Sequence, residues 1–397
     1  MTGKFHTTWG EFGGFKHVNA LRYETAAMIA NGAKCSVGDQ LHPCGKMDMA
    51  TYELIGAAYN DVEKLEQYCT DTVTQSEIAI LSVESLNACL ANHWNPVFPD
   101  EGACRMLLES QVMFDVIDTD ADFSRYRLLI LPDEVTVNEK LALALNRFLA
   151  GGGRLILSGT SGLDNLKEKY NINTCLLPLG ISPWNNDYIT VRKKLESGSV
   201  ASQFVTYKNA LMIDPQGAEI LADVQQPYFN RSYDHFCSHQ HTPHEKKADY
   251  PAVIRDKNII VFAHPVFSMY RISGQMLFRN MVRCALRLLL GEMQFESNMP
   301  STARMSYMRQ NNRLLLHLLN AVPVSRGGNG DWPMEKAIEV IEDCIPLHEI
   351  KISVAVPLKV KRVYNITGNT ELEHTQKNNR VFFTLPYMEH HALIMME

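Results

Sequence analysis

The chain has little of what marks membrane, nucleic-acid-binding or disulfide-rich proteins. Within its 397 residues, no apolar run reaches the length of about 18 positions that a membrane span needs. The net charge is −6 and the basic residues form no stripe, which argues against a nucleic-acid partner. The nine cysteines are scattered and odd in number. That pattern is typical of free thiols in a reducing compartment, so we expect a cytoplasmic protein without membrane contact.

The turn after residues 154–157 lacks two catalytic signatures that often follow such a strand: a phosphate- or dinucleotide-binding loop and the nucleophilic Cys of an amidotransferase. Residues 159–162, GTSG, follow an apolar strand but lack the Gly-Lys-Ser/Thr ending of a phosphate loop and the glycine spacing of a dinucleotide site. An amidotransferase needs a Cys on a tight strand-to-helix elbow, and this turn offers Ser158 and Ser161 instead. The surrounding domain is therefore predicted to be non-catalytic, and no cofactor is expected.

The most informative stretch that is present is residues 5–14, FHTTWGEFGG. Residues 5–9 alternate like a short strand, which places Trp9 at its carboxyl end beside Glu11. The surrounding glycines let the backbone turn sharply and let a ligand come close. A carboxylate beside an indole in such a turn suits sugar cleavage. A capping Glu on a surface loop is an equal alternative.

The first seventy residues alternate strands and helices. Strands are predicted at 5–9 and 33–37, and helices at 18–30 and 49–66. In a (β/α)₈ barrel the catalytic groups follow the carboxyl ends of the strands, which is where Glu11 and Asp39 fall. A whole barrel takes about 250 residues. We therefore expect residues 1–70 to be the terminal strands and helices of a TIM barrel, with the missing barrel portion supplied elsewhere, on another chain for example.

Two further domains are predicted downstream. Residues 71–295 alternate buried strands with amphipathic helices, which predicts a doubly wound, amidotransferase-like (flavodoxin-like) domain. Residues 296–397 contain short alternating runs separated by turn residues, which is typical of an antiparallel β-sandwich. The expected fold class is thus a multidomain α/β protein: a barrel end, an amidotransferase-like domain and a sandwich.

A histidine-rich stretch, residues 228–244, interrupts the middle domain. His235, Cys237, His239 and His241 alternate, so they would share one face if the chain were extended. Such groups lie about 7 Å apart along a strand, so one metal would hold two at most, and no metal is predicted. A loop that contacts a polyhydroxylated ligand or a neighbouring subunit is favoured. A histidine-rich solvated loop is the alternative.

Three motifs and the order of the domains resemble a known family. The motifs are WGEFGG at 9–14, GDQLHP at 38–43 and HFCSHQHTP at 235–243. They resemble the α-L-fucosidase-like glycoside hydrolases, similar to glycoside hydrolase family 151, which are related to family 42 β-galactosidases with a trimerisation domain. The resemblance implies hydrolysis of terminal sugars, most simply α-L-fucosides, by two carboxylates. It also implies a homo-oligomer, with a trimer expected. A β-galactosidase and a non-catalytic oligomerisation or carbohydrate-binding module are the alternatives.

The resemblance also assigns roles to individual residues. Glu11 takes the position of a catalytic carboxylate, the nucleophile, while the second carboxylate lies outside this chain. Trp9 would form a stacking floor for the sugar, because aromatic faces suit the apolar side of a pyranose. Asp39 and His42 would contact hydroxyl groups or tune Glu11. The implied substrate-binding residues are His6, Trp9, Lys16, Asp39, His42, Arg231, His235, His239 and His241.

Overall fold

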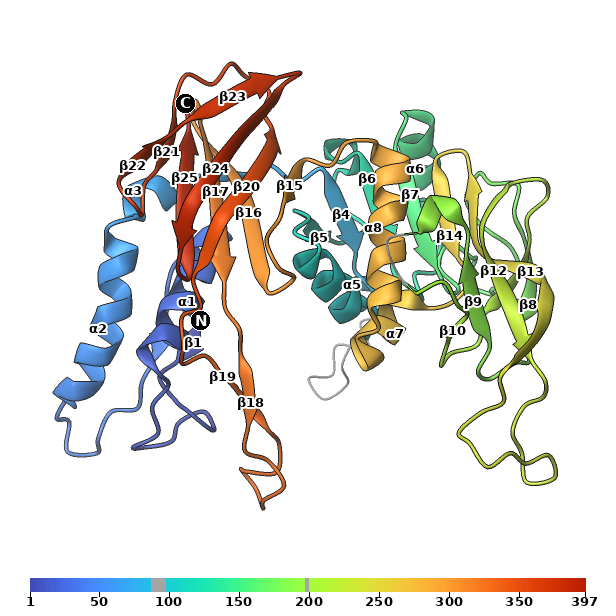
Figure 1. Ribbon diagram of the computed structural model, residues 1–397, viewed down its shortest axis with the longest axis horizontal. Coiled ribbons are helices and arrows are strands. Elements are labelled where there is room, and N and C mark those ends of the chain that lie inside the picture. Colours follow the sequence, from blue (N-terminus) through green and yellow to red (C-terminus); the bar gives the residue numbers. More distant parts are fainter. Residues whose placement is uncertain (87–97, 197–199) are drawn as a thin grey trace. The chain divides into compact units, whose positions relative to one another are not determined.

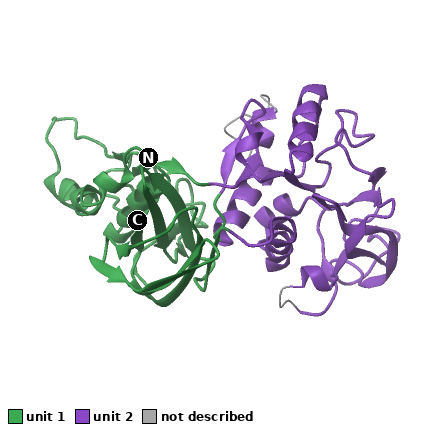
Figure 2. Ribbon diagram, turned by 90° about the horizontal axis from the view of Figure 1, so that it is seen from above, with its two compact units in different colours: residues 1–75, 111–113, 294–397 green, residues 76–110, 114–293 purple. Residues whose placement is uncertain are grey.

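The computed structural model describes residues 1–86, 98–196 and 200–397. Two compact units are formed (Figure 2): unit 1 comprises residues 1–75, 111–113 and 294–397, and unit 2 comprises residues 76–110 and 114–293. Both units contain helices and strands, so the expected multidomain α/β class is confirmed. The three-part division at residues 70 and 295 stays a prediction. Among the described residues, no helix has the length and apolarity needed to cross a membrane.

The N-terminal part of unit 1 alternates short strands with helices (Figure 1). The elements are β1 (Thr2–Gly3), α1 (Val18–Ala30), β2 (Val37–Gly38), α2 (Met49–Glu63), α3 (Glu66–Cys69) and β3 (Val73–Thr74). Strands β1 and β2 pair in parallel. The predicted helices are confirmed, and the side chain of Asp48 caps α2 by accepting from the N–H of Ala50.

The prediction of a strand over residues 5–9 is wrong. The structure places the strand at β1 and gives residues 6–10 bends and a turn. The physical reason is that the N–H of Thr7 donates to Oε1 of Glu11, four residues later, instead of joining a ladder. The second strand is likewise shifted, from 33–37 to β2.

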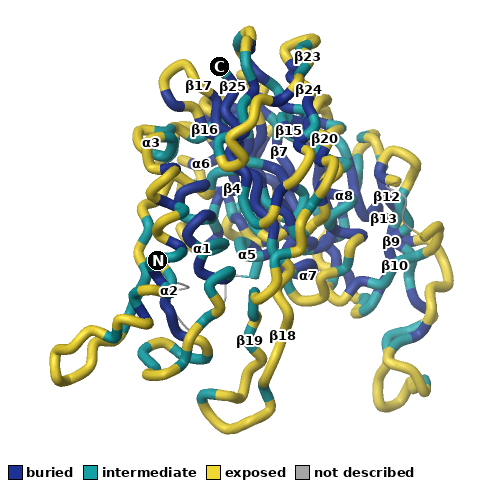
Figure 3. The backbone as a smooth tube through the Cα atoms, turned by 60° about the vertical axis from the view of Figure 1, so that its left-hand side comes forward, coloured by how far each residue is buried: buried dark blue, intermediate teal, exposed yellow. Residues whose placement is uncertain are grey.

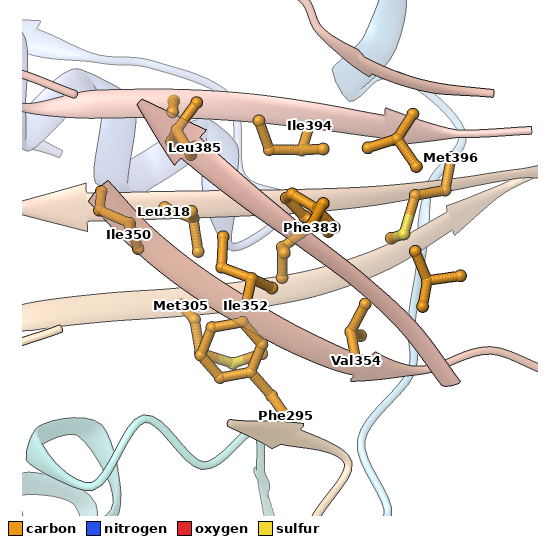
Figure 4. Packing of buried hydrophobic residues seen from close by; sticks show 14 of the residues in the cluster. Phe295, Met305, Leu318, Ile350, Ile352, Val354, Phe383, Leu385, Ile394 and Met396 are labelled. Carbon is orange, nitrogen blue, oxygen red and sulfur yellow. The ribbon is translucent and has the colours of Figure 1, made fainter. Parts of the chain in front are cut away.

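The C-terminal part of unit 1 is an antiparallel sandwich. Its strands are β15 (Phe295–Ser297), β16 (Ala303–Gln310), β17 (Arg313–Asn320), β20 (Leu347–Ala355), β21 (Val363–Asn365), β22 (Thr370–Leu372), β23 (His374–Lys377), β24 (Arg380–Met388) and β25 (His391–Met396). One sheet has the order β15-β20-β24-β23, and the other β22-β21-β25-β17-β16-β3. Ile352, Phe383 and Ile394 meet between the two sheets (Figure 4). The hairpin β18 (Val324–Arg326) and β19 (Ile338–Val340) is largely exposed (Figure 3).

Helices α1 and α2 are held by the sandwich itself. Strand β17 is buried on both faces, because one face meets the other sheet while Leu315 packs with Ile29 of α1 and Val62 of α2. Leu319 of the same strand packs with Ala26 and other residues of α1. The outer face of the six-stranded sheet therefore buries the helices that follow β1 and β2.

Unit 2 is built on one mixed sheet. Its strands are β4 (Ile78–Leu81), β5 (Asp115–Ile117), β6 (Leu128–Leu131), β7 (Arg154–Ser158), β9 (Tyr188–Val191), β10 (Phe204–Val205), β12 (Glu219–Pro227), β13 (His244–Asp256) and β14 (Ile259–Phe262). The order is β10-β9-β12-β13-β14-β7-β6-β4-β5, and the stretch from β14 to β5 is parallel. A separate pair, β8 (Leu177–Ile181) and β11 (Leu211–Asp214), is antiparallel.

The helices of unit 2 cover this sheet. They are the short α4 (Val83–Leu86), α5 (Phe98–Glu109), α6 (Glu139–Ala150), α7 (Val266–Ser273) and α8 (Met276–Leu290). Helices α7 and α8 are separated by Gly274, whose φ of +62° ends α7 in a left-handed cap. The buried strands β4, β6 and β7 read as continuous apolar runs, as parallel strands covered on both faces require.

Candidate functional site

Trp9 forms an exposed platform on the two parallel strands of unit 1. Its indole lies against Gly38 of β2 and Gly3 of β1, where added Cβ atoms would come within 2.5 Å and 2.9 Å of the ring. Phe5 supports it edge-on, with the ring centroids 5.1 Å apart. The side chain is nevertheless 61% exposed. The strands thus hold a rigid aromatic surface that is open to a ligand, as the stacking of a pyranose requires.

The Glu11 carboxylate closes the turn that follows Trp9. Its Oε1 accepts from the N–H of Thr7 at 2.5 Å. The carboxyl group rests against Gly14, where an added Cβ would lie 2.3 Å from it. Glu11 is half-buried. The backbone N–H of Thr7 therefore holds one carboxylate oxygen of Glu11, Oε1, in place. It does not bind the other oxygen, Oε2.

A buried lysine, Lys4, organises the same turn. Its Nζ lies 3.3 Å from the carbonyl oxygen of Glu11 and 3.5 Å from that of Gly14. The ammonium also lies 4.5 Å from the ring centroid of Phe15, a cation–π distance. Lys4 is only 3% exposed. Lys4 was not among the site residues expected from the sequence, because lysines are seldom buried. The neighbouring Phe5 was the only sign in the sequence that Lys4 would be buried.

The loops after β1 and β2 lie against one another. Asp39 directly follows β2 and is half-buried. The ring of His42 lies 5.2 Å from the ring of Phe12. The side chain of Gln40 approaches Gly10, where an added Cβ would lie 3.8 Å from its Oε1. Parallel pairing thus brings the Glu11 turn and the His42 loop to the same end of the two strands, as expected.

Two other residues expected to bind substrate, Lys16 and His6, do not lie against Trp9 or Glu11 through any contact described above. Lys16 donates to Glu24 of α1 at 2.8 Å and to Oγ1 of Thr2 at 2.9 Å. This ion pair ties the chain after the Glu11 turn to α1 and β1. His6 is exposed at the start of the bend.

The histidine-rich loop in unit 2 is not extended. Residues 228–243 link β12 to β13 through bends, so the extended conformation in which alternate side chains would share one face is not formed. His235 stacks on Phe229, with parallel rings 4.1 Å apart. Arg231 lies 5.0 Å from the ring of Phe236, and His239 is exposed. Over the described ranges, no three His, Cys, Asp or Glu side chains are grouped so as to hold a metal.

His241 is fixed to the sheet by Tyr188. The two side chains are linked by a hydrogen bond of 3.0 Å between Nδ1 of His241 and the Tyr188 oxygen. The Tyr188 hydroxyl donates to the carbonyl of Thr242, so Nδ1 of His241 must carry the proton that it shares with Tyr188. Burial raises the pKa of Tyr188, which keeps the hydroxyl protonated. The base of the loop is thereby anchored to β9.

The comparisons show which proteins the chain is similar to. Residues 104–232 match the family model described as the β-galactosidase trimerisation domain. The structure is similar to that of the α-L-fucosidase isoenzyme 2 from Paenibacillus thiaminolyticus. The chain is 38% identical to that protein, with a TM-score of 0.92 over the whole of this chain and 60% of that one. The expected resemblance is confirmed.

More distant similarity connects the chain to β-galactosidases. The β-galactosidase GanA of Bacillus subtilis (strain 168) is 29% identical over 133 residues, which are 32% of this chain and 20% of that protein. The structure of the β-galactosidase from Bacillus circulans sp. alkalophilus is 14% identical, with a TM-score of 0.63 over the whole of this chain and 55% of that one. At that identity the likeness is one of fold alone. The chain spans 60% or less of each of these relatives.

Proposed function

We propose that the chain is the C-terminal part of a glycoside hydrolase that releases terminal sugars, with α-L-fucosides as the preferred substrates. The observation that supports this most directly is the 38% identity, over the whole chain, to an α-L-fucosidase. In this proposal residues 1–70 close a TIM barrel, residues 71–295 form an amidotransferase-like domain without catalytic residues, and residues 296–397 form the sandwich. The parallel pairing of β1 and β2 supports the barrel assignment.

Glu11 is proposed to be the nucleophile of a retaining mechanism. Its Oε2, the oxygen not bound by the N–H of Thr7, attacks the anomeric carbon, forming a glycosyl–enzyme bond while the bond to the leaving oxygen breaks. A second carboxylic acid, from the rest of the barrel, gives its proton to that leaving oxygen and later takes one from the water that releases the sugar. The N–H of Thr7 fixes the orientation of the Glu11 carboxylate by donating to Oε1.

The neighbouring side chains are proposed to hold the sugar. Trp9 offers its exposed face to the apolar side of the ring, and Asp39 and His42 contact hydroxyl groups from the adjacent loop. His6 and Lys16 are further proposed substrate contacts; for Lys16 this requires release of its ion pair with Glu24. The histidine-rich loop, with Arg231, His235, His239 and His241, is proposed to contact a polyhydroxylated ligand or a neighbouring subunit. A homotrimer is proposed because of the match to a trimerisation domain.

An assay on aryl glycosides tests the substrate. The chain, joined to the remaining barrel strands, is offered aryl α-L-fucoside and aryl β-galactoside in parallel. We expect turnover of the fucoside to exceed that of the galactoside. Preference for the galactoside would favour the β-galactosidase alternative, which the similarity to GanA supports. Failure to cleave either substrate, with sugar binding retained, would favour a non-catalytic binding module.

A further inference from the structure

A hollow in unit 2 is lined by three arginines. It is bordered by the short helical turn η1 (Phe123–Arg125), the end of α6 and the start of β7, and it encloses about 630 Å³. Pockets that bind small molecules enclose about 300–1,000 Å³. Arg127, Arg147 and Arg154 come from three separate segments and all line the hollow. The hollow therefore has the size of a ligand site and gathers positive charge.

Two of these arginines have no acidic partner. Arg127 donates to the carboxylate of Glu77 at 2.8 Å. Arg147 and Arg154, in contrast, form no ion pair in the part of the chain that the structure describes. Nη1 of Arg154 donates to the carbonyl of Gly152 at 3.3 Å. The chain as a whole carries a net charge of −6, so two uncompensated guanidinium groups in one hollow form a local exception.

The negative groups beside the hollow are already engaged. Asp122 is the one acid among the described residues that line it, and its Oδ1 accepts from the N–H of Ser124 at 3.0 Å and from the hydroxyl at 2.7 Å. Carbonyl oxygens at the end of α6 accept from the N–H groups of the glycine turn, residues 151–153. These glycine N–H groups are therefore not donors for a ligand. The guanidinium groups are, and their charge outweighs that of Asp122.

Aromatic rings form the apolar part of the same hollow. Phe123 and Phe148 both line it, and both are buried. Their rings meet edge-on with the centroids 6.5 Å apart. Tyr126, also buried, lines the hollow beside them. A ligand held by the arginines would thus meet an apolar wall as well, which suits an organic group and is of no use to a bare inorganic ion.

The charges and the apolar wall together define the ligand. A guanidinium group matches the geometry of phosphate oxygens and can donate two parallel hydrogen bonds to them. We propose that this hollow binds a small phosphate monoester, with the phosphate group on Arg147 and Arg154 and the organic group against Phe123 and Phe148. This site does not involve Glu11, and it goes beyond the proposed hydrolysis of glycosides.

Calorimetric titration of the 397-residue chain tests the ligand class. The probes are glucose 6-phosphate and inorganic phosphate, in a phosphate-free buffer of low ionic strength, with glucose as the neutral competitor. We expect glucose 6-phosphate to bind more tightly than inorganic phosphate, glucose not to displace it, and added salt to weaken it, because salt screens exposed charges. Equal affinity for the two phosphates would overturn the monoester assignment. Binding of neither would overturn the site.

Substitution of the two arginines tests the location. In Arg147→Gln/Arg154→Gln we expect the affinity for glucose 6-phosphate to fall about 100-fold or more, because charged hydrogen bonds to the phosphate are lost. The matched control is Arg309→Gln on β16, an exposed arginine that should bind as the parent does. Circular dichroism checks that both variants are folded.

Two results would contradict this location. One is parent-like affinity in the double arginine variant, and the other is an equal loss of affinity in Arg309→Gln. The titration requires no turnover, and the two arginines belong to unit 2 whereas Glu11 belongs to unit 1. Failure of the phosphate site is therefore distinguishable from failure of the proposed sugar chemistry.

Discussion

The indole of Trp9 lies over Gly38, at a position where a Cβ would come within 2.5 Å of the ring. Gly38→Ala should therefore displace the platform. Because the lost stacking contributes about 1 kcal/mol, we expect sugar affinity to fall roughly fivefold. Titration of the sugar, followed by tryptophan fluorescence, measures the change. Unchanged affinity together with an unchanged emission spectrum would remove Trp9 from the site.

Gly56→Ala is the matched control for that substitution. Gly56 lies within α2, and a Cβ built there meets nothing within 4 Å. Alanine is the better helix former, so we expect a gain of up to about 1 kcal/mol in the free energy of unfolding, without any effect on sugar binding. Urea denaturation measures the gain.

Lys4 is predicted to hold the Glu11 turn in place. Lys4→Met keeps the length of the side chain but removes the ammonium that the carbonyls of Glu11 and Gly14 accept from. Hydrogen bonds to charged groups contribute about 1.5–3 kcal/mol, so amides of residues 11–14 should exchange at least about tenfold faster. Lys46→Met, an exposed lysine, is the control. Equal exchange in the two variants would show that the turn does not depend on Lys4.

The buried His317 and its half-buried partner His391 predict that the protein loses stability in acid. Nδ1 of His317 and Nε2 of His391 are 3.0 Å apart on neighbouring strands β17 and β25. Burial lowers the pKa of His317 to about 4 and that of His391 well below its usual value. Between pH 6.5 and 4 these two histidines are therefore protonated in the unfolded chain but remain neutral in the folded chain. The free energy of unfolding should fall by up to about 1.4 kcal/mol per pH unit for each histidine.

Removal of the pair should flatten this pH dependence. In His317→Leu/His391→Leu, the difference between the free energies of unfolding at pH 7 and pH 5 should shrink, as measured by urea denaturation at both values. His348→Leu, an exposed histidine, should keep the slope of the parent. A double variant as acid-sensitive as the parent would mean that other groups carry the effect.

A buried carboxylate, Asp133, joins three elements of unit 2. It accepts from Oγ of Ser158 at 2.6 Å and from both Oγ and N of Ser268, in α7, at 2.6 Å and 2.7 Å. Asp133→Ala would leave these donors buried without an acceptor, so we expect a loss of about 3 kcal/mol or more. Thermal unfolding measures the loss. Asp120→Ala removes an exposed ion pair with Lys140 and should change little. Similar effects of the two substitutions would contradict the assigned role of Asp133.

Much of the local structure could be predicted from the residues themselves. Asp48 and the apolar spacing after it predicted α2, and the short alternating runs after residue 299 predicted the main strands of the sandwich. These signals are local, since a cap or an alternation needs no distant partner. The strand predicted at residues 5–9 does not form, because an alternating sequence does not by itself provide a neighbouring strand to pair with. The N–H of Thr7 donates to the Glu11 side chain instead.

Contacts between distant segments could not be predicted in this way. Nothing in α1 indicates that Ile29 packs against Leu315, or that β3 joins the sandwich beside β16. Such placement depends on which surfaces remain apolar after the whole chain has folded. The candidate site divides in the same manner: Trp9 and Glu11 were visible as a motif, whereas Lys4 became visible only when its burial was known.

The turnover number of Glu11→Gln, in the chain joined to the remaining barrel strands, tests the central claim most directly. If Glu11 is the nucleophile, kcat on aryl α-L-fucoside should fall by about 10³-fold or more, while Glu63→Gln, an exposed residue of α2, should match the parent. A Glu11→Gln enzyme that retains kcat within about tenfold of the parent would contradict the account.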